Sequence, residues 1–198
     1  ARPVPGIYTD NSLKPYREWL SADSEEANLE FGGSFVSDNI EAYYTTPYDL
    51  GDGHIVKFDH DFIGREALES LPDEKKRVKV PIVWDAYDVQ RIFASQLGDG
   101  PRYKSLELPS VNYSFNQFDE LRTINGDFAG VSCHAAYYRP AGVFQSIAMV
   151  DPKFSKPGTE LVMIWGEPNG GSRKPHVERH EQTTIRVTVA EEPTLRLI

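Results

Sequence analysis

Three tyrosines and several carboxylates gather in one short stretch, residues 40–53, and this cluster is the first candidate for chemistry in the chain. Tyr43, Tyr44 and Tyr48 could form the wall of a pocket that stacks on a flat heterocycle. The neighbouring carboxylates could accept hydrogen bonds from its amino and amide groups. The alternative is that the tyrosines only pack this loop against its own domain, and both interpretations stay open on residue chemistry alone.

Some of the histidines are candidate metal ligands or bases. His176 and His180 are four residues apart, a spacing that lets two side chains on a helix share a metal ion. Pro175 precedes this pair and a strand-like run follows it, so the sequence predicts no metal site. His60 has an aspartate on each side, which suits a general base or a polar contact to a cofactor. A turn histidine in solvent is the other interpretation.

Cys133 is the only cysteine, and His134 lies next to it. Adjacent residues of a strand point to opposite faces, so a direct thiol–imidazole pair is not expected and Cys133 is predicted to be a small core residue. A single cysteine also excludes an intrachain disulfide, which favours a reducing, cytoplasmic setting. Residues 51–53 lack both the remainder of a dinucleotide fingerprint and a Walker lysine, so no nucleotide site is predicted.

The composition argues against some classes of binding partner. The chain has 198 residues, of which 39% are hydrophobic, and it has a formal net charge of −9. This is a globular composition with room for a proper core. The acidic balance argues against nucleic acid or an anionic membrane surface as a partner. The apolar runs are far shorter than the roughly 20 residues that cross a bilayer.

The elements that would position these residues divide at a charged run, residues 72–77. Before it, the sequence predicts mostly ordered loop with one short helix near residues 14–20, where Pro15 suits a first helical position. Residues 55–58 then read as a strand. The helix expected after that strand would place Ile63, Ala67 and Leu71 on one face.

After the charged run the sequence becomes rich in β-branched and aromatic residues. Residues 78–84 read as a strand and residues 86–97 as an amphipathic helix. Further strands are predicted at residues 120–124, 128–137, 143–150, 160–165 and 183–189, with Gly-rich and Pro-rich turns between them. The predicted fold class is therefore α+β, mostly β, with a Greek-key-like or jelly-roll-like barrel.

Several segments together resemble one family. These are residues 32–41, 43–51, 56–68, 146–152, 156–160, 165–167 and 174–180. The sequence resembles the aminomethyltransferase family, and within it the tetrahydrofolate-dependent vanillate and syringate O-demethylases, which are related to the glycine cleavage T-protein. The resemblance extends over nearly the whole chain.

The resemblance implies an arrangement of domains. Residues 1–75 would be the C-terminal remnant of an α/β folate-binding region, and residues 76–198 would be the C-terminal barrel. Domains N-terminal to residue 1 would complete the protein, so this part alone is expected to be inactive. The implied reaction moves a methyl group from an aromatic methyl ether to tetrahydrofolate and needs no metal.

The resemblance also implies site residues. Tyr43 would assist methyl transfer, and Tyr44, Tyr48, Glu30 and His60 would contact the folate. Glu30 is similar to the glutamate of a Leu-x-Leu-Glu-Ala pattern in the T-protein. One departure is visible, because Asp52 stands where the family more often has an aromatic residue after Leu-Gly.

Two alternatives remain. One is a glycine cleavage aminomethyltransferase, which would act on a lipoylated protein partner. The other is a non-catalytic β-barrel binding module, in which the tyrosine loop serves packing alone. A part of a larger enzyme is expected to leave an apolar face uncovered around Ile7, Tyr8, Trp19 and Leu20, whereas a stand-alone module is not.

Overall fold

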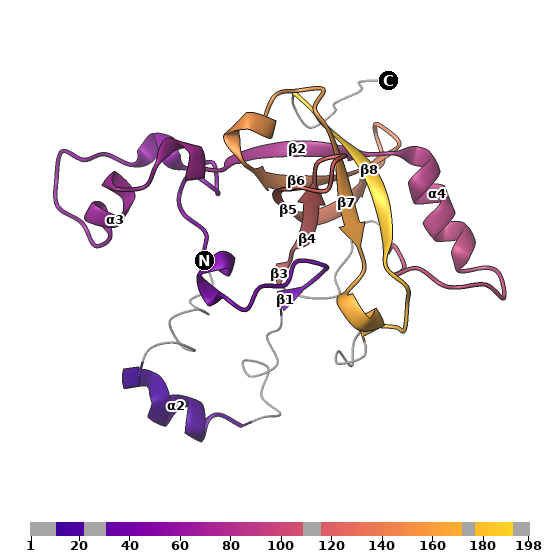
Figure 1. Ribbon diagram of the computed structural model, residues 1–198, viewed down its shortest axis with the longest axis horizontal. Coiled ribbons are helices and arrows are strands. Elements are labelled where there is room, and N and C mark those ends of the chain that lie inside the picture. The colour runs from indigo at the N-terminus through magenta and orange to yellow at the C-terminus, as the bar shows by residue number, and fades with distance from the viewer. Residues whose placement is uncertain (1–10, 22–30, 109–115, 172–176, 192–198) are drawn as a thin grey trace.

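A closed barrel of six antiparallel strands forms the centre of the computed structural model (Figure 1), which describes residues 11–21, 31–108, 116–171 and 177–191. The strand order around the barrel is β2-β6-β5-β4-β7-β8. The strands are β2 (Val78–Trp84), β4 (Asp119–Arg122), β5 (Phe128–Tyr138), β6 (Val143–Val150), β7 (Glu160–Trp165) and β8 (Thr183–Val189). This confirms the predicted fold class of α+β, mostly β.

The order of the strands contains a Greek key. Strands β4, β5 and β6 follow one another as antiparallel neighbours, and β7 returns to lie beside β4. The barrel closes where β2 pairs with both β6 and β8. Closure leaves no free edge in this sheet, so the structure is a single barrel and not a two-sheet jelly roll.

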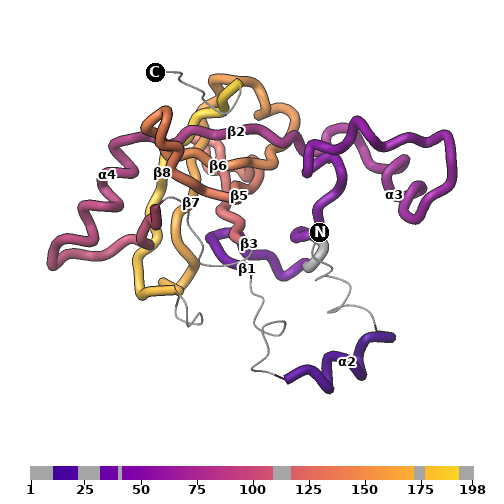
Figure 2. Tube along the Cα trace, turned by 180° about the vertical axis from the view of Figure 1, so that it is seen from behind, coloured from indigo at the N-terminus to yellow at the C-terminus, as the bar shows by residue number. Residues whose placement is uncertain are grey.

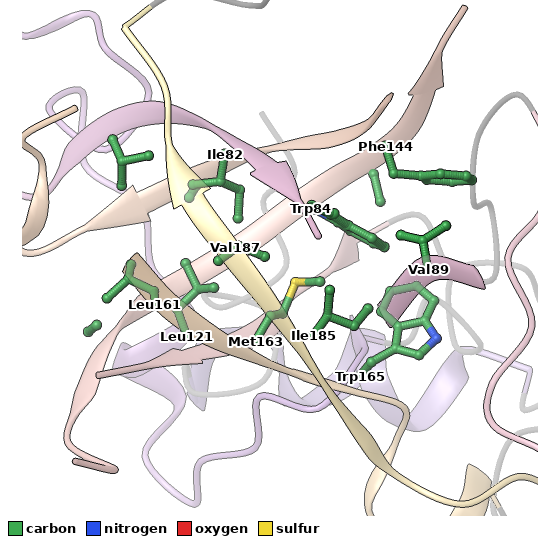
Figure 3. Close-up of a cluster of buried hydrophobic side chains, with 14 of the residues drawn as sticks. Ile82, Trp84, Val89, Leu121, Phe144, Leu161, Met163, Trp165, Ile185 and Val187 are labelled. Atoms are coloured by element: carbon green, nitrogen blue, oxygen red, sulfur yellow. The ribbon is translucent and has the colours of Figure 1, made fainter. Parts of the chain in front are cut away.

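Alternating burial along the strands builds the core. In β7, Leu161, Met163 and Trp165 point inward and are almost completely buried, while the residues between them are partly exposed. Aromatic rings fill one end of this core, where Trp84 packs edge-on against Trp165 with ring centroids 5.3 Å apart and stacks on Phe144 at 5.7 Å (Figure 3).

The helix α4 (Ala86–Ser95) follows β2 and packs against the barrel. The Asp85 side chain caps it by accepting hydrogen bonds from the backbone N–H groups of Tyr87 and Asp88, each at 3.0 Å. Val89 and Ile92 are buried against the barrel. The helix ends two residues before the predicted end, and Leu97 is exposed, because no described element covers it.

The region before the barrel has little regular structure. It contains η1 (Asn11–Leu13), the predicted short helix α2 (Lys14–Trp19) with its proline in the first turn, β1 (Phe31–Gly32), η2 (Ile40–Tyr43) and η3 (Gly53–Ile55). It continues with α3 (Arg65–Glu69) and η4 (Asp73–Lys75). The segment with α3 projects away from the barrel in both views (Figures 1 and 2).

Two sequence predictions in that segment were wrong. Residues 55–58 form no strand, because η3 ends at Ile55 and no described strand lies beside the segment to pair with it. The helix α3 has only five residues, and Ile63 lies before it and is fully exposed. An apolar run gains little as a strand or a helix when nothing covers its face.

Two short elements connect the early part of the chain to the barrel. The strand β1 pairs in parallel with β3 (Asn116–Gln117), which precedes β4 (Figure 2). The short 3-10 helices η5 (Pro152–Phe154) and η6 (Pro168–Gly171) lie in connections between barrel strands.

The barrel begins at Val78, but the proposed division into residues 1–75 and 76–198 stays a prediction. No helix within the described ranges has the length and hydropathy to cross a membrane.

Of the four residues named for an uncovered apolar face, Ile7 and Tyr8 lie outside the described residues. Trp19 is 78% exposed, and Leu20 is partly buried. The ring of Trp19 contacts Tyr16, with centroids 6.0 Å apart.

Candidate functional site

Tyr43 ends η2 and lines a small pocket between the early loop and the barrel. The pocket is shallow and opens to solvent, and its cavity volume of about 10 Å³ is roughly the space that one water molecule needs. Its lining includes Phe35, Arg77, Phe118 and Met149. Met149 is buried, yet its strand neighbours on both sides point into the barrel core, so Met149 faces outward and the early loop covers it.

Two contacts hold Tyr43 in place. The backbone N–H of Ser37 donates a hydrogen bond of 2.9 Å to the Tyr43 hydroxyl oxygen. The Tyr43 ring packs edge-on against Phe35 with centroids 5.2 Å apart, and Phe35 also contacts Phe128 at 5.8 Å. The hydroxyl and the ring are therefore both fixed by residues 35–37.

An ion pair closes one side of the pocket. Arg77 Nε donates to Asp49 Oδ1 at 2.6 Å, and Arg77 Nη2 donates to the Tyr44 carbonyl at 3.3 Å. Asp49 is almost completely buried, and its other oxygen accepts hydrogen bonds from the backbone N–H and the hydroxyl of Thr46. Asp49 thus holds the loop in shape, and this use of the carboxylate was not foreseen.

The other predicted site residues are spread over the early region. Tyr44 is 38% exposed. Tyr48 lies against Gly53, where an added Cβ would come within 2.5 Å of the ring, and Lys76 sits 5.1 Å over that ring. The Tyr48 ring therefore packs within the loop. Among the three tyrosines, Tyr43 lines the pocket.

His60 is exposed, away from the pocket lining. Its Nδ1 is 2.7 Å from Asp59 Oδ1, and its ring lies 5.7 Å from that of Phe62. Glu30 and His176 lie outside the described residues. The roles given to Tyr44, Tyr48, Glu30 and His60 stay predictions.

A buried ionic cluster, consisting of Lys104, Asp119, Glu167 and His180, was missed by the sequence reasoning. Lys104 is fully buried, and its ammonium donates to Glu167 Oε1 at 2.7 Å. The Lys104 ammonium also lies 5.3 Å over the Trp165 ring. Such a cluster has no periodicity to reveal it, although the segments around Glu167 and His180 had been noted for the family resemblance.

His180 is held as a neutral ring by its hydrogen bonds. Nε2 accepts from the backbone N–H of Glu167 at 2.9 Å, and Nδ1 lies 2.8 Å from the Glu178 carbonyl, to which it donates. Glu167 Oε2 is 3.4 Å from Nε2. Because the Nε2 lone pair is already used, that contact is not an ion pair.

Burial and charge set the protonation of this cluster. Burial raises the pKa of Asp119 to about 6, although the Lys104 ammonium opposes the shift. Burial also disfavours the Glu167 carboxylate, but Lys104 and the Gly33 N–H outweigh it and lower the pKa of Glu167. Asp119 is thus the carboxyl group of this cluster whose charge changes closest to neutral pH.

Cys133 does not have the properties of a nucleophile. Burial, together with the Asp119 charge, raises the pKa of its thiol to about 11, so the thiolate is scarce at neutral pH. Its side chain is partly buried on β5, next to an irregularity in the pairing with β6. His134 lies in that irregularity with a φ of 54° and is exposed.

The Tyr43 pocket by itself does not hold a whole folate. Pockets for small molecules usually have volumes of about 300–1,000 Å³, and the Tyr43 pocket, with about 10 Å³, is far smaller. It offers an aromatic wall and one cation, which can contact part of a ligand only. Within the described ranges, no group of three or more His, Cys, Asp or Glu side chains gathers as metal ligands would.

Comparison with known proteins places the chain beside two enzymes. It is 44% identical over 191 residues to syringate O-demethylase from Sphingobium sp. (strain NBRC 103272 / SYK-6), covering 96% of this chain and 41% of that protein. It is 31% identical over 179 residues to sesamin methylene transferase from Sinomonas sp. (strain No.22), covering 82% of this chain and 36% of that protein.

No family model matches the chain. The chain spans about two fifths of the length of the curated relatives it matches. Over almost its whole length it is therefore similar to a part of an O-demethylase, and over most of its length to a part of a methylene transferase.

Proposed function

We propose that this chain is part of a tetrahydrofolate-dependent one-carbon transferase that moves a methyl group from a methoxylated aromatic acid to tetrahydrofolate. The observation that supports it most is the 44% identity to syringate O-demethylase over 96% of the chain. The second relative is named for methylene transfer, so both names describe one-carbon chemistry.

Tyr43 suits the chemistry at the departing oxygen. When an aryl methyl ether loses its methyl group, negative charge develops on the phenol oxygen and must be stabilised or protonated. A tyrosine hydroxyl within hydrogen-bonding reach can do either. Tyr43 lines the pocket with its hydroxyl held by Ser37, so its position is fixed in advance.

The site is expected to be completed by other parts of a longer protein. The pocket is open to solvent and smaller than a folate needs, and the relatives are more than twice as long as the matched region. In this proposal, the described residues supply one wall with Tyr43 and Arg77. The missing N-terminal domains supply the remaining contacts to folate and to the methyl donor.

Two alternatives lead to different results. A glycine cleavage aminomethyltransferase would use a lipoylated protein as donor, and neither named relative is such an enzyme. A non-catalytic barrel module would bind neither donor nor folate.

The first experiment incubates the full-length protein with tetrahydrofolate and syringate or vanillate that carries a deuterated methoxy methyl group.

Mass spectrometry should then show the labelled methyl group on tetrahydrofolate and the matching phenol in equal amounts. A parallel reaction contains a labelled aminomethyl-lipoyl protein in place of the aromatic donor. Label transfer in that reaction, and none from syringate or vanillate, would support the T-protein alternative. If calorimetric titration shows no folate binding to the full-length protein, the folate proposal is wrong.

Replacing Tyr43 by Phe tests its role. The hydroxyl is lost while the ring contact with Phe35 is kept, so we expect turnover to fall by about a hundredfold, within the usual range for general acid–base groups. Folate affinity should change little. The matched control is Tyr87→Phe, because Tyr87 is 75% exposed on α4. Equal turnover of the Tyr43 variant and the wild type would remove Tyr43 from the mechanism.

A further inference from the structure

Residues 32–37, which we call the strap, connect the barrel to Tyr43. At one end of the strap, Gly33 N–H donates to Glu167 Oε1 at 2.9 Å, and Ser34 N–H donates to Asp119 Oδ1 at 3.2 Å. The Ser34 hydroxyl donates to the Ile164 carbonyl at 2.7 Å. Three polar groups of the barrel therefore hold two consecutive residues of the strap.

The other end of the strap holds Tyr43. Phe35 packs edge-on against the Tyr43 ring, and the Ser37 N–H donates to the Tyr43 hydroxyl. The Phe35 N–H is itself tied to the Phe118 carbonyl at 3.0 Å. A short chain of contacts thus runs from the buried carboxylates to the hydroxyl of Tyr43.

Only glycine fits at position 33 of the strap. This residue has a φ of 92°, and an added Cβ would collide with the Phe118 carbonyl oxygen. A shift of Gly33 away from the barrel would break its hydrogen bond to Glu167. The Glu167 oxygen therefore holds the strap at Gly33, between the backbone hydrogen bonds that Gly32 and Phe35 form with Phe118.

Stability alone does not account for the Lys104–Glu167 pair. Both side chains are almost completely buried. A buried ion pair usually stabilises a fold no better than apolar side chains of the same size, because both charges lose their hydration. The pair does supply a fixed hydrogen-bond acceptor for the Gly33 N–H.

We propose that Glu167 is a positioning residue for Tyr43: by accepting the Gly33 hydrogen bond, it fixes the strap and, through Ser37 and Phe35, the hydroxyl of Tyr43. Asp119 supports the same end of the strap through Ser34. This inference rests on the proposed role of Tyr43 in the one-carbon transfer.

The test uses two double variants of the full-length protein. Lys104→Met with Glu167→Gln removes both charges but keeps an amide oxygen that can accept from Gly33. Lys104→Met with Glu167→Leu removes the charges and the acceptor, with a side chain of similar size. We expect the turnover of the Gln variant to stay within twofold of the wild type, because the acceptor is kept. The turnover of the Leu variant should fall about tenfold. A tenfold loss corresponds to about 1.4 kcal/mol of transition-state stabilisation.

A double-mutant cycle separates positioning from general damage. In a Tyr43→Phe background, the Leu variant should lose little further turnover, because its effect passes through the missing hydroxyl. Equal losses in the Gln and Leu variants, or the same tenfold loss without the Tyr43 hydroxyl, would overturn the proposal.

The position of Tyr43 is also measured without activity. In protein labelled with ¹³C at tyrosine Cζ, the Tyr43 resonance is assigned by its absence in Tyr43→Phe. It should shift in the Leu variant and stay close to the wild-type position in the Gln variant. This measurement still decides the proposal if Tyr43→Phe proves fully active, an outcome that would count against the proposed function alone.

If the Leu variant does not fold, Lys104→Met with Glu167→Met takes its place, because it also removes the acceptor of the Gly33 N–H. A Tyr43 resonance and turnover that are unchanged in this folded variant would then contradict the proposal.

Discussion

At the scale of residues, three glycines let the chain wrap around His180. Gly166 has a φ of 101°, and a Cβ there would lie 2.8 Å from His180 Cδ2. At Gly170, a Cβ would lie 2.5 Å from the His180 carbonyl oxygen, and at Gly171 it would lie 3.2 Å from Cε1. These glycines are needed because the backbone passes this close to the ring of His180 at Gly166 and Gly171, and to its carbonyl group at Gly170.

We expect Gly166→Ala to lower the free energy of unfolding by more than Gly126→Ala does. Both positions have φ near 100°, and a non-glycine residue there costs roughly 1–3 kcal/mol. Only Gly166 adds the collision with His180, since nothing lies within 4 Å of a Cβ at Gly126. Urea denaturation of the two variants measures the difference, and equal losses would show that the ring moves aside freely.

Asp119 should make stability depend on pH. Burial raises its folded pKa to about 6, above the usual value near 3.9 of an unfolded chain. The folded state therefore binds the proton more tightly, and the contribution of Asp119 to stability is lost as pH rises from about 4 to 6. Lys104 opposes this shift and Glu167 reinforces it.

The measurement compares the wild type with Asp119→Asn by urea denaturation from pH 4 to 7. Relative to the variant, the wild type should lose stability on the order of 3 kcal/mol across this range. Parallel stability curves would mean that the carboxyl group titrates at its ordinary pKa. Both proteins share the other titrating groups, so the contributions of those groups cancel in the difference between the two unfolding free energies.

At the scale of elements, the Asp49–Arg77 pair attaches the tyrosine loop to the start of β2. Arg77 directly precedes the first barrel strand, while Asp49 lies in the loop that follows Tyr43. The guanidinium reaches two partners, the Asp49 carboxylate and the Tyr44 carbonyl. A lysine ammonium is a point charge and does not reproduce this fork.

Arg77→Lys is therefore expected to destabilise the protein by about 1–3 kcal/mol, the cost of leaving buried polar groups poorly bonded. The Asp49 loop should also become easier to cleave with protease. Arg139→Lys is the control, because Arg139 is exposed in the turn between β5 and β6. Equal melting temperatures for the two variants would show that the fork adds nothing.

The barrel strands could be read from the sequence because each has an alternating pattern and a partner. The bounds predicted for residues 78–84, 143–150, 160–165 and 183–189 agree with the structure. The strand predicted at residues 55–58 was wrong. Residue types indicate which structure a segment favours, but they do not show whether another strand lies beside it.

The candidate site was only partly predictable. Residue types pointed to the three tyrosines together, and the family resemblance singled out Tyr43, which lines the pocket. Lys104 and Asp119 gave no signal, because Glu167 and Ser34, which bind them, are distant in sequence and their burial depends on the whole fold. Long-range polar contacts of this kind leave no period in a single sequence.

At the scale of the whole molecule, substitutions on the inner face of the barrel should destabilise the protein much more than substitutions on its outer face. Ile82 on β2 is completely buried, whereas Ile147 on the neighbouring strand β6 is 39% exposed. We expect Ile82→Ala to cost about 2–5 kcal/mol, as for other buried large-to-small changes. Ile147→Ala should cost clearly less, as thermal unfolding of both variants would show.

The order in which the strands pair also has a consequence for protein synthesis. The ribosome makes β2 first among the barrel strands, yet one of its two neighbours, β8, is the last to emerge. Until then β2 has an unpaired edge on that side, and pairings between such distant segments form slowly. Nascent chains stalled before residue 183 should therefore bind chaperones and aggregate. Chains stalled after β8 has left the ribosome should do neither.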